Sequence, residues 1–374
     1  MSDVLKDLEE KIYIHRKKRR KTLMIRGLAL TAAALLLFAC IRLFTGDTAV
    51  TTTSEQPDLS PTEDGPAAES ESQTASSQVQ ITVSLMGDCT LGTDESFYWD
   101  TSLNAYFEYH GAPYFFENVR SILEQDDLSI VNMEGTLTTQ EQREEKLFAF
   151  KGPYEFVDIL TEGSVEAANL ANNHSRDYGE QSYLDTRDSL ENAGITTFGY
   201  EETAILTIKG IKIGLLGIYE LEDHLNRSRQ VLDLLEKLRE EGAQLIIAVF
   251  HWGNEKETSP DSNQTTLAHL AIDQGADLVV GHHPHVLQPI EEYKGKYIAY
   301  SLGNFCFGGN SNPSDKDTII FQQTFTFRDG ALAADKDIHI VPCRISSDAS
   351  CNNYQPTPVD GEDASRILEK LDLP

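Results

Sequence analysis

Short apolar segments alternate with helical segments along residues 79–374, and this alternation constrains the fold more strongly than any other feature of the chain. The apolar segments lie at 79–88, 128–132, 165–171, 211–218, 244–250, 276–281, 296–303 and 318–327. The helical patterns lie between them at 113–125, 153–163, 180–194, 229–242 and 264–275, and most end in glycine, as helices often do. This order predicts an α/β domain with extensive parallel pairing, and near-continuous apolar strands fit sheets buried on both faces.

Polar side chains that can bind a metal ion follow six of these apolar segments. In chain order they are Asp88, Asn132 and Glu134, Asn173 and His174, His251, His283 and His285, and Asn304. In α/β sheets the loops at the carboxyl ends of the strands meet along one edge and form the ligand crevice. We therefore predict that the side chains from Asp88 to His285 are neighbours, although about 200 residues separate the first from the last.

The chemistry of this set favours a metal site. Carboxylates, amides and imidazoles suit Zn, Mn or Fe, and the set lacks the thiolates of most structural zinc sites. The pair His283 and His285 flanks Pro284, which disfavours a helix, and suits a strand end or an extended backbone. Alternate residues of an extended chain face opposite sides, so one imidazole would face each of two ions. A bridging carboxylate, Asp88 or Glu134, would hold such ions about 3.5–4 Å apart.

Each motif taken alone also has a structural interpretation. Asp88 could belong to a turn or a helix cap, Asn173 could cap a helix, His251 could be a packed core residue, and Asn304 could stabilise a turn. Three imidazoles clustered beside a glycine, in GHHPH at 281–285, have little structural use. Because all the motifs follow strands in one chain, a metal site explains them better than separate structural roles.

The five cysteines are too few and too scattered for a disulfide framework or a cysteine-based zinc site. Cys343 and Cys351 could pair if this part of the chain lies outside the cytoplasm. Cys89, next to Asp88, could be a soft metal ligand, but a small buried residue is the simpler interpretation.

The charge of the chain is strongly acidic and unevenly distributed. The net charge is −29 overall, but residues 1–44 contain ten Lys or Arg against four Asp or Glu, so residues 45–374 carry −35. Such a body repels polyanions, which argues against nucleic acid as a partner. A polyanionic substrate would need local cations or a metal ion to be held there.

The amino-terminal part predicts a membrane anchor. A basic segment at 1–21 precedes uncharged residues 27–41, and an apolar helix over 22–44 would measure about 35 Å, enough to cross a bilayer with its terminal arginines at the headgroups. The basic segment stays cytoplasmic, so the body lies outside the cell membrane. A cleaved signal peptide, or lipidation at Cys40, is an alternative interpretation.

The segment that follows the anchor has the composition of a tether. Residues 45–77 contain no aromatic residue and no Lys or Arg, and they are rich in Ser, Thr, Pro and Glu. Such a segment cannot bury enough apolar surface to offset its ordering entropy. We expect a disordered linker at 45–78 and an extracytoplasmic domain at 79–374.

Taken in order, the motifs resemble the CapA family of capsule and poly-γ-glutamate synthesis proteins, a branch of the calcineurin-like metallophosphoesterases. The resemblance covers roughly 80–310 and rests on GD, NxE, NNHxxDxG, HWGxE, GHHPH and SLGNF. It implies a four-layer α/β sandwich of two sheets and a dinuclear centre of Mn, Zn or Fe. It implies the metal ligands Asp88, Glu134, Asn173, His251, His283 and His285, with His282 outside the first coordination shell.

The sequence departs from the superfamily pattern in two places. The usual Asp-x-His start is absent, because Cys89 and Thr90 follow Asp88. Glu134 stands where many relatives have Asp. Both departures leave the identity and number of the ions open.

Two functions are compatible with these features. The first is a metal-dependent hydrolase that cleaves a phosphoester or amide bond of an anionic cell-envelope polymer, with His174 as general acid, Asp177 orienting it, and Asn173 and Asn304 holding an oxyanion. The second is a non-catalytic, metal-binding component that guides poly-γ-glutamate or capsule polymer among membrane-bound synthesis and export subunits.

Overall fold

The computed structural model describes residues 78–334 and 337–374. The predicted basic segment at 1–21, the anchor at 22–44 and all of the predicted linker except Gln78 lie outside the described residues. Within the described part of the chain, no helix has the length and apolar character that crossing a membrane requires. All described residues belong to one compact unit, Gln73–Pro374.

The larger of two main sheets, here called sheet I, has nine strands among the described residues. Their order is β17-β16-β14-β1-β2-β5-β6, with β13 beside β1 and β15 beside β14. The strands are β1 (Gln78–Thr90), β2 (Leu128–Met133), β5 (Ala167–Asn169), β6 (Thr196–Phe198), β13 (Asn304–Phe307), β14 (Asp317–Arg328), β15 (Ala331–Leu332), β16 (Asp337–Arg344) and β17 (Thr357–Pro358). The strands β13, β1, β2, β5 and β6 run parallel, whereas β14 pairs with β1 in the antiparallel sense.

The second sheet, sheet II, has the order β11-β12-β10-β9-β8-β7 in the described residues. Its strands are β7 (Ala204–Ile208), β8 (Ile211–Tyr219), β9 (Leu245–His251), β10 (Leu278–His282), β11 (Ile290–Tyr293) and β12 (Lys296–Ala299). The four central strands are parallel, and each edge strand is antiparallel to its neighbour. A separate two-stranded ladder joins β3 (Thr136–Leu137) to β4 (Lys151–Gly152).

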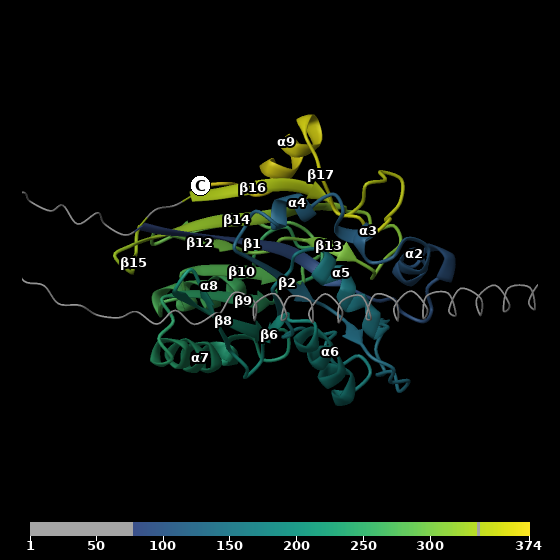
Figure 1. Ribbon diagram of the computed structural model, residues 1–374, viewed down its shortest axis with the longest axis horizontal. Coiled ribbons are helices and arrows are strands. Elements are labelled where there is room, and N and C mark those ends of the chain that lie inside the picture. The colour runs from purple at the N-terminus through teal and green to yellow at the C-terminus, as the bar shows by residue number, and fades with distance from the viewer. Residues whose placement is uncertain (1–77, 335–336) are drawn as a thin grey trace, which may run out of the picture. The chain divides into compact units, whose positions relative to one another are not determined.

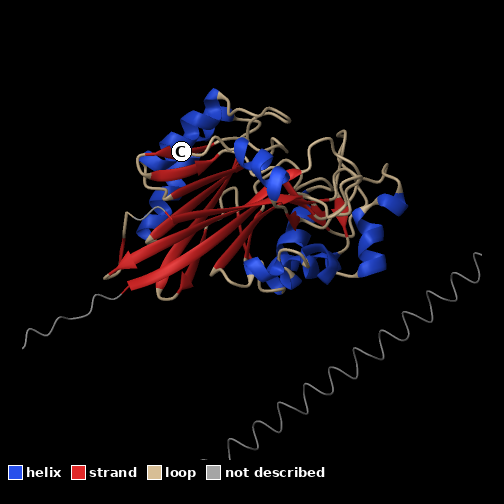
Figure 2. Ribbon diagram, turned by 90° about the horizontal axis from the view of Figure 1, so that it is seen from above, coloured by secondary structure: helices blue, strands red, loops and turns tan. Residues whose placement is uncertain are grey.

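Helices cover the outer face of each sheet, which makes four layers. Sheet I packs against α2 (Leu103–His110), α3 (Pro113–Phe116), α4 (Arg120–Leu123), α5 (Val157–Glu162) and α6 (Glu180–Asn192). Sheet II packs against α7 (Ser228–Glu240) and α8 (Ser262–Asp273). Figure 1 shows α7 and α8 beside β8 and β9, and Figure 2 shows the strands grouped together with helices around them.

The core between the two sheets consists of residues that alternate along the strands. Ile81, Val83 and Leu85 of β1 face sheet II, whereas Met86 packs on the outer side with the helices. Each fully buried side chain of this size contributes about 1.5–3 kcal/mol. Helix α9 (Gly361–Glu369) closes one edge of the sandwich, where Ile367 is buried in this core.

The predicted α/β architecture with two sheets buried on both faces is confirmed, and each of the eight predicted strands is present in the described residues. The single helix predicted at 113–125 is wrong. The structure has two short helices there, α3 and α4, separated by a turn at 117–119, and the carbonyl oxygen of Tyr114 in α3 accepts a hydrogen bond from Nε2 of Gln355 at 2.8 Å. A contact between residues so distant in sequence leaves no local signal.

The two sheets approach each other closely where Gly217 of β8 meets Asn169 of β5. A Cβ atom at Gly217 would lie 2.0 Å from Oδ1 of Asn169 and 2.8 Å from Cα of Gly199. Only glycine allows this approach, which brings the carboxyl ends of the two sheets together.

We expect Gly217→Ala to lower the free energy of unfolding by about 3 kcal/mol, because the added methyl group overpacks a buried contact. Urea unfolding followed by circular dichroism measures the loss. Gly210→Ala is the control: its Cβ would meet no atom within 4 Å, and only its positive φ of 83° is strained, which costs about 1 kcal/mol. Equal losses in the two variants would contradict the close approach.

Candidate metal centre

Two rows of polar residues meet at one end of the sandwich, mostly at the carboxyl ends of their strands; Asn304 is the exception, because it is the first residue of β13. The row on sheet I follows the strand register across four strands and consists of Asn304, Asp88, Asn132 and Asn169. The row on sheet II follows the register of three strands and consists of Tyr219, His251 and His282. Residues in register lie side by side, so the stacking of the sheets brings the two rows together. The predicted convergence of these strand ends is confirmed.

Asp88 lies at the centre of the arrangement and is fully buried. Its Oδ1 accepts a hydrogen bond from Nδ2 of Asn132 at 2.8 Å, and its Oδ2 accepts from the backbone N–H of His283 at 3.3 Å. The Nδ1 atoms of His282 and His285 each lie 3.2 Å from the carboxylate. Burial pushes the pKa of Asp88 upward, but the hydrogen bonds and charges of His282 and His285 outweigh burial and hold it well below its usual range.

A chain of buried amides fixes the position of Asp88 relative to His251. Nδ2 of Asn132 lies 3.3 Å from Nδ1 of His251, while Oδ1 of Asn132 accepts from Nδ2 of Asn169 at 2.8 Å. Asn172 donates from Nδ2 to the backbone oxygen of Met133 at 2.8 Å. These amides link β2, β5 and β9, so the carboxylate and the imidazole are held by both sheets.

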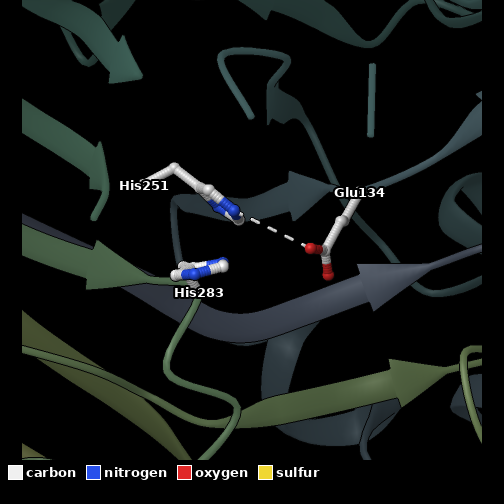
Figure 3. A group of neighbouring side chains, drawn as sticks. All are labelled: Glu134, His251 and His283. Atoms are coloured by element: carbon white, nitrogen blue, oxygen red, sulfur yellow. Dashed lines mark ion pairs between the residues drawn. The ribbon is translucent and has the colours of Figure 1, made fainter. Parts of the chain in front are cut away.

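Glu134 extends from the end of β2 into the space between three imidazoles. Its Oε1 lies 3.7 Å from Nε2 of His251 and 3.9 Å from Nε2 of His285, and its Oε2 accepts from Oγ1 of Thr90 at 3.1 Å. Figure 3 shows the carboxylate of Glu134 pointing toward His251, with His283 beside it. Among the described residues, Oε1 of Glu134 and Nδ1 of His283 are buried polar atoms without a hydrogen-bond partner.

These side chains form two groups that could each hold a metal ion. Glu134, His251 and His283 make one group, and Asp88, Glu134 and His285 make the other; in each, the ligand atoms lie within 4.8 Å of one another. The groups share Glu134, as expected if this carboxylate bridges two ions. The unpartnered oxygen and nitrogen and the mixed donor set fit a divalent cation such as Zn, Mn or Fe.

Burial sets the protonation of most of this cluster. It lowers the pKa of His251 well below the usual value and the pKa of His283 to about 3, so both imidazoles are neutral, the form that binds metal. Burial also acts to lower the pKa of His285, but the charges of Glu134 and Asp88 outweigh it and raise this pKa to about 9. Burial and the nearby Asp88 charge raise the pKa of Glu134.

The loop after β10 differs from the expected extended backbone. The strand ends at His282, as the sequence predicts, but His283 and His285 have positive φ angles of 97° and 57°. This strained conformation is held by hydrogen bonds from the backbone N–H of Lys256 to the oxygen of Pro284 at 2.8 Å and from His283 to Asp88. The prediction of an extended backbone is wrong, yet the two imidazoles still belong to different groups of candidate ligands.

The turn after β5, residues 172–178, supplies Asn173 and His174. Oδ1 of Asn173 lies 2.8 Å from Nε2 of His251, so this amide borders the candidate centre. Asn173 does not cap a helix, because α6 begins at Glu180 with Gly179 as its N-cap. Nδ1 of His174 lies 2.8 Å from Oδ2 of Asp177, which is the predicted orienting contact.

Lys146 stabilises the same turn, and the sequence does not predict its contacts there. Its Nζ donates to Oδ1 of Asp177 and to the backbone oxygen of Asn173, both at 2.7 Å, and lies 3.3 Å from Nδ1 of His174. It stands at the end of a run of charged residues at 141–146 that resembles any solvated loop, so no sequence signal distinguishes it.

Asn304 and Asn169 have roles that the motifs alone do not reveal. Both ends of the Asn304 amide contact His285: Oδ1 lies 2.9 Å from its Nδ1, and Nδ2 donates to its backbone oxygen at 3.3 Å. The amide therefore positions His285 in this structure, and the predicted contact with an oxyanion stays a prediction. The strand register with Asn132 is the signal that would have pointed to Asn169.

The four cysteines of the described residues take no part in either group of candidate ligands. Cys89 is buried, and burial raises its pKa to about 12, so it is a protonated thiol rather than a thiolate ligand. Cys343 and Cys351 are free in the structure.

We expect the chelator-treated protein to bind Mn²⁺ or Zn²⁺, and a concentration 100 times the Kd to raise Tm by roughly 4–5 °C, because binding stabilises the folded state by about 2.7 kcal/mol. His251→Ala removes a buried candidate metal ligand and should abolish most of this rise in Tm. Asn132→Ala, which removes an amide that supports His251, should weaken the affinity for the metal ion about 10–100-fold.

Thermal unfolding at increasing metal concentration measures the rise in Tm and the affinity, and metal analysis of the dialysed protein shows whether the ion stays bound. His269→Ala is the matched control, because His269 pairs with Glu291 outside the cluster. Wild-type protein that binds neither ion, or a His251→Ala variant that binds as tightly as wild type, would rule out this centre.

The chain is similar to bacterial proteins of capsule and poly-γ-glutamate synthesis. It is 31% identical over 237 residues to "PGA biosynthesis protein CapA" of Bacillus subtilis, covering 57% of this chain and 62% of that one. It is 28% identical over 319 residues to "Capsule biosynthesis protein CapA" of Bacillus anthracis, covering 78% of this chain and 73% of that one.

A solved structure of a hypothetical protein from Thermus thermophilus shares 16% identity and a TM-score of 0.43, covering 70% of this chain and 99% of that one. The profile of the family described as "Bacterial capsule synthesis protein PGA_cap" matches residues 82–309, which span the strand ends from Asp88 to Asn304. The chain therefore belongs to the PGA_cap family of bacterial capsule synthesis proteins.

Proposed function

We propose that this chain is a metal-dependent hydrolase of capsule or poly-γ-glutamate biosynthesis that acts on a phosphoester or amide bond of an anionic envelope polymer. The observation that carries the proposal is the pair of buried ligand groups sharing Glu134, beside a turn that presents His174. When bound, divalent ions in such a site supply a hydroxide nucleophile near neutral pH and polarise the attacked group.

The protein residues around the centre suit the remaining steps of hydrolysis. Because Asp177 engages Nδ1 of His174, the other ring nitrogen is available to give a proton to the leaving group. Lys146 pairs with Asp177 at 2.7 Å and keeps the turn in place. The ring of Phe150 lies 4.6 Å from the imidazole of His174, between centroids, and shields it from water.

The charge of the chain supports a role for metal ions in holding an anionic polymer. Residues 45–374 carry a net charge of −35, so bulk electrostatics repel such a substrate. Bound divalent ions would reverse the charge locally. The names of the Bacillus relatives, which refer to capsule and PGA biosynthesis, indicate the class of polymer.

One observation favours a second, non-catalytic function. In the Asp-x-His start of many metallophosphoesterases, the position of the histidine ligand is occupied here by Thr90, whose Oγ1 donates to Oε2 of Glu134 at 3.1 Å. The intervening Cys89 is a buried, protonated thiol, so this ligand has no equivalent here. A centre with fewer ligands could bind and guide a polymer, as a component of a synthesis or export complex, without cleaving it.

We further propose the location of the protein. Residues 22–44 would anchor it in the cell membrane by a single span, with the domain from residue 79 onward outside the membrane and close to membrane-bound synthesis and export subunits. The acidic, Ser- and Thr-rich segment between them would let the domain reach a growing polymer chain.

We expect the purified protein with Mn²⁺ or Zn²⁺ to shorten γ-linked polyglutamate or to cleave a chromogenic phosphodiester. His174→Ala should lower kcat about 10²–10⁴-fold while metal binding persists, because this variant removes a proton donor rather than a candidate ligand in either group. Chain-length analysis of the polymer and release of the chromophore measure the two activities.

His251→Ala should abolish both activities together with metal binding, and His269→Ala should leave all three unchanged. Metal-dependent binding of polymer without turnover would contradict the hydrolase and support the guiding role.

A further inference from the structure

A cavity of about 410 Å³ opens directly beside the candidate metal centre. It is lined by residues of the turn after β5, by Tyr200 and Glu201, and by the segment that leads from β8 to α7. Asn173 belongs both to the cavity wall and to the centre, since its Oδ1 lies 2.8 Å from Nε2 of His251. A group bound in this cavity would therefore lie next to the reacting atoms.

Arg176 provides the first cationic group of the cavity, and its orientation is fixed. Its guanidinium carbon lies 4.3 Å from the ring centroid of Tyr183 and 4.4 Å from that of Tyr200. Nε donates to Oε2 of Glu180 at 2.6 Å. A guanidinium has five N–H donors in one plane, and this ion pair uses the Nε donor, so the terminal nitrogens can present further donors at the cavity.

Arg227 provides the second cationic group. Its Nη2 lies 2.8 Å from Oδ2 of Asp223, its Nη1 donates to Oε1 of Gln230 at 3.1 Å, and its side chain is 22% exposed. These contacts hold the side chain against the start of α7. Two arginines therefore line one cavity of a strongly acidic body, and guanidinium groups are well suited to bind a carboxylate because two of their donors can engage it together.

The cavity wall also contains carboxylates that can accept hydrogen bonds. Glu201 and Glu222 lie in its wall, so it is not a plain anion site. A ligand that carries a carboxylate and an amide N–H close together would match both kinds of group. Each unit of poly-γ-glutamate carries an α-carboxylate beside the amide bond that links it to the next unit.

We propose that this cavity is a subsite for one carboxylate-bearing unit of the polymer, with the carboxylate on Arg176 and Arg227 and the adjoining amide bond directed toward the metal centre. The proposal rests on the proposed function for the identity of the polymer. The subsite itself requires no catalysis, so binding and turnover can be tested separately.

The test is the affinity of a γ-linked glutamate tetramer for the full chain in chelator, measured by isothermal titration calorimetry. Wild-type protein should bind the tetramer, and Arg176→Gln and Arg227→Gln should each weaken binding about 10-fold or more, because each removes a charge-assisted hydrogen bond. Arg176→Lys keeps the charge without the planar fork and should bind between wild type and Arg176→Gln.

Controls separate this subsite from general charge effects. Arg229→Gln removes an equal charge from α7, where Arg229 is 79% exposed and pairs with Asp233, and should bind the tetramer as wild type does. Thermal unfolding shows whether each variant is folded. If Arg176→Gln fails to fold, Arg227→Gln provides the test, because only Arg176 packs against the rings of Tyr183 and Tyr200.

Probes with altered chemistry identify the group that is recognised. A tetramer whose α-carboxylates are carboxamides should lose binding, and a glycerol phosphate oligomer should bind more weakly than the glutamate tetramer. The proposal fails if the carboxamide binds equally well, if the phosphate oligomer binds better, if wild type binds no tetramer, or if the arginine variants bind as wild type does. If the arginine variants bind the tetramer more weakly than wild type does, but the protein does not cleave the polymer, the subsite is supported and the hydrolase is rejected.

Discussion

The buried carboxylate of Asp88 is the interaction on which the arrangement of the two sheets depends at this end. An ionised carboxylate without partners in a protein interior costs several kcal/mol. Here Asn132, the backbone of His283, and the imidazoles of His282 and His285 surround it. Because Asn132 belongs to sheet I and the histidines to sheet II and its loop, the charge is stabilised only when both sheets are in place.

The same region contains features that a purely structural core would avoid. Oε1 of Glu134 and Nδ1 of His283 are buried without a hydrogen-bond partner among the described residues, and His283 and His285 adopt a left-handed backbone. Such costs are tolerated at functional sites when the surrounding structure imposes them. The apolar clusters on both faces of each sheet provide that support, and a divalent cation between these atoms would satisfy both of them.

Electrostatics connect the metal centre with the neighbouring cavity. A body with a net charge of −35 over residues 45–374 repels anionic polymers, so the proposed binding of such a polymer depends on local features. The centre concentrates carboxylates and imidazoles that a cation can bind, whereas the cavity beside it is lined by Arg176 and Arg227. Asn173 borders both, so a polymer unit bound in one would be aligned with the other.

Much of this arrangement was predictable from the sequence, because the spacing of apolar residues depends on whether a segment forms a strand or a helix. Apolar segments separated by helical patterns predicted buried sheets with extensive parallel pairing, and the family resemblance implied that there are two of them. The rule that carboxyl ends of parallel strands share an edge predicted that Asp88, Glu134, His251 and His285 would meet. The tertiary structure alone decided the strand order, the break between α3 and α4, the contact of Lys146 with Asp177, and the packing of Arg176 against two tyrosine rings. Each of these depends on contacts between residues distant in the chain, whose energies arise only after the sheets have packed, and so they leave no periodic signal in the sequence.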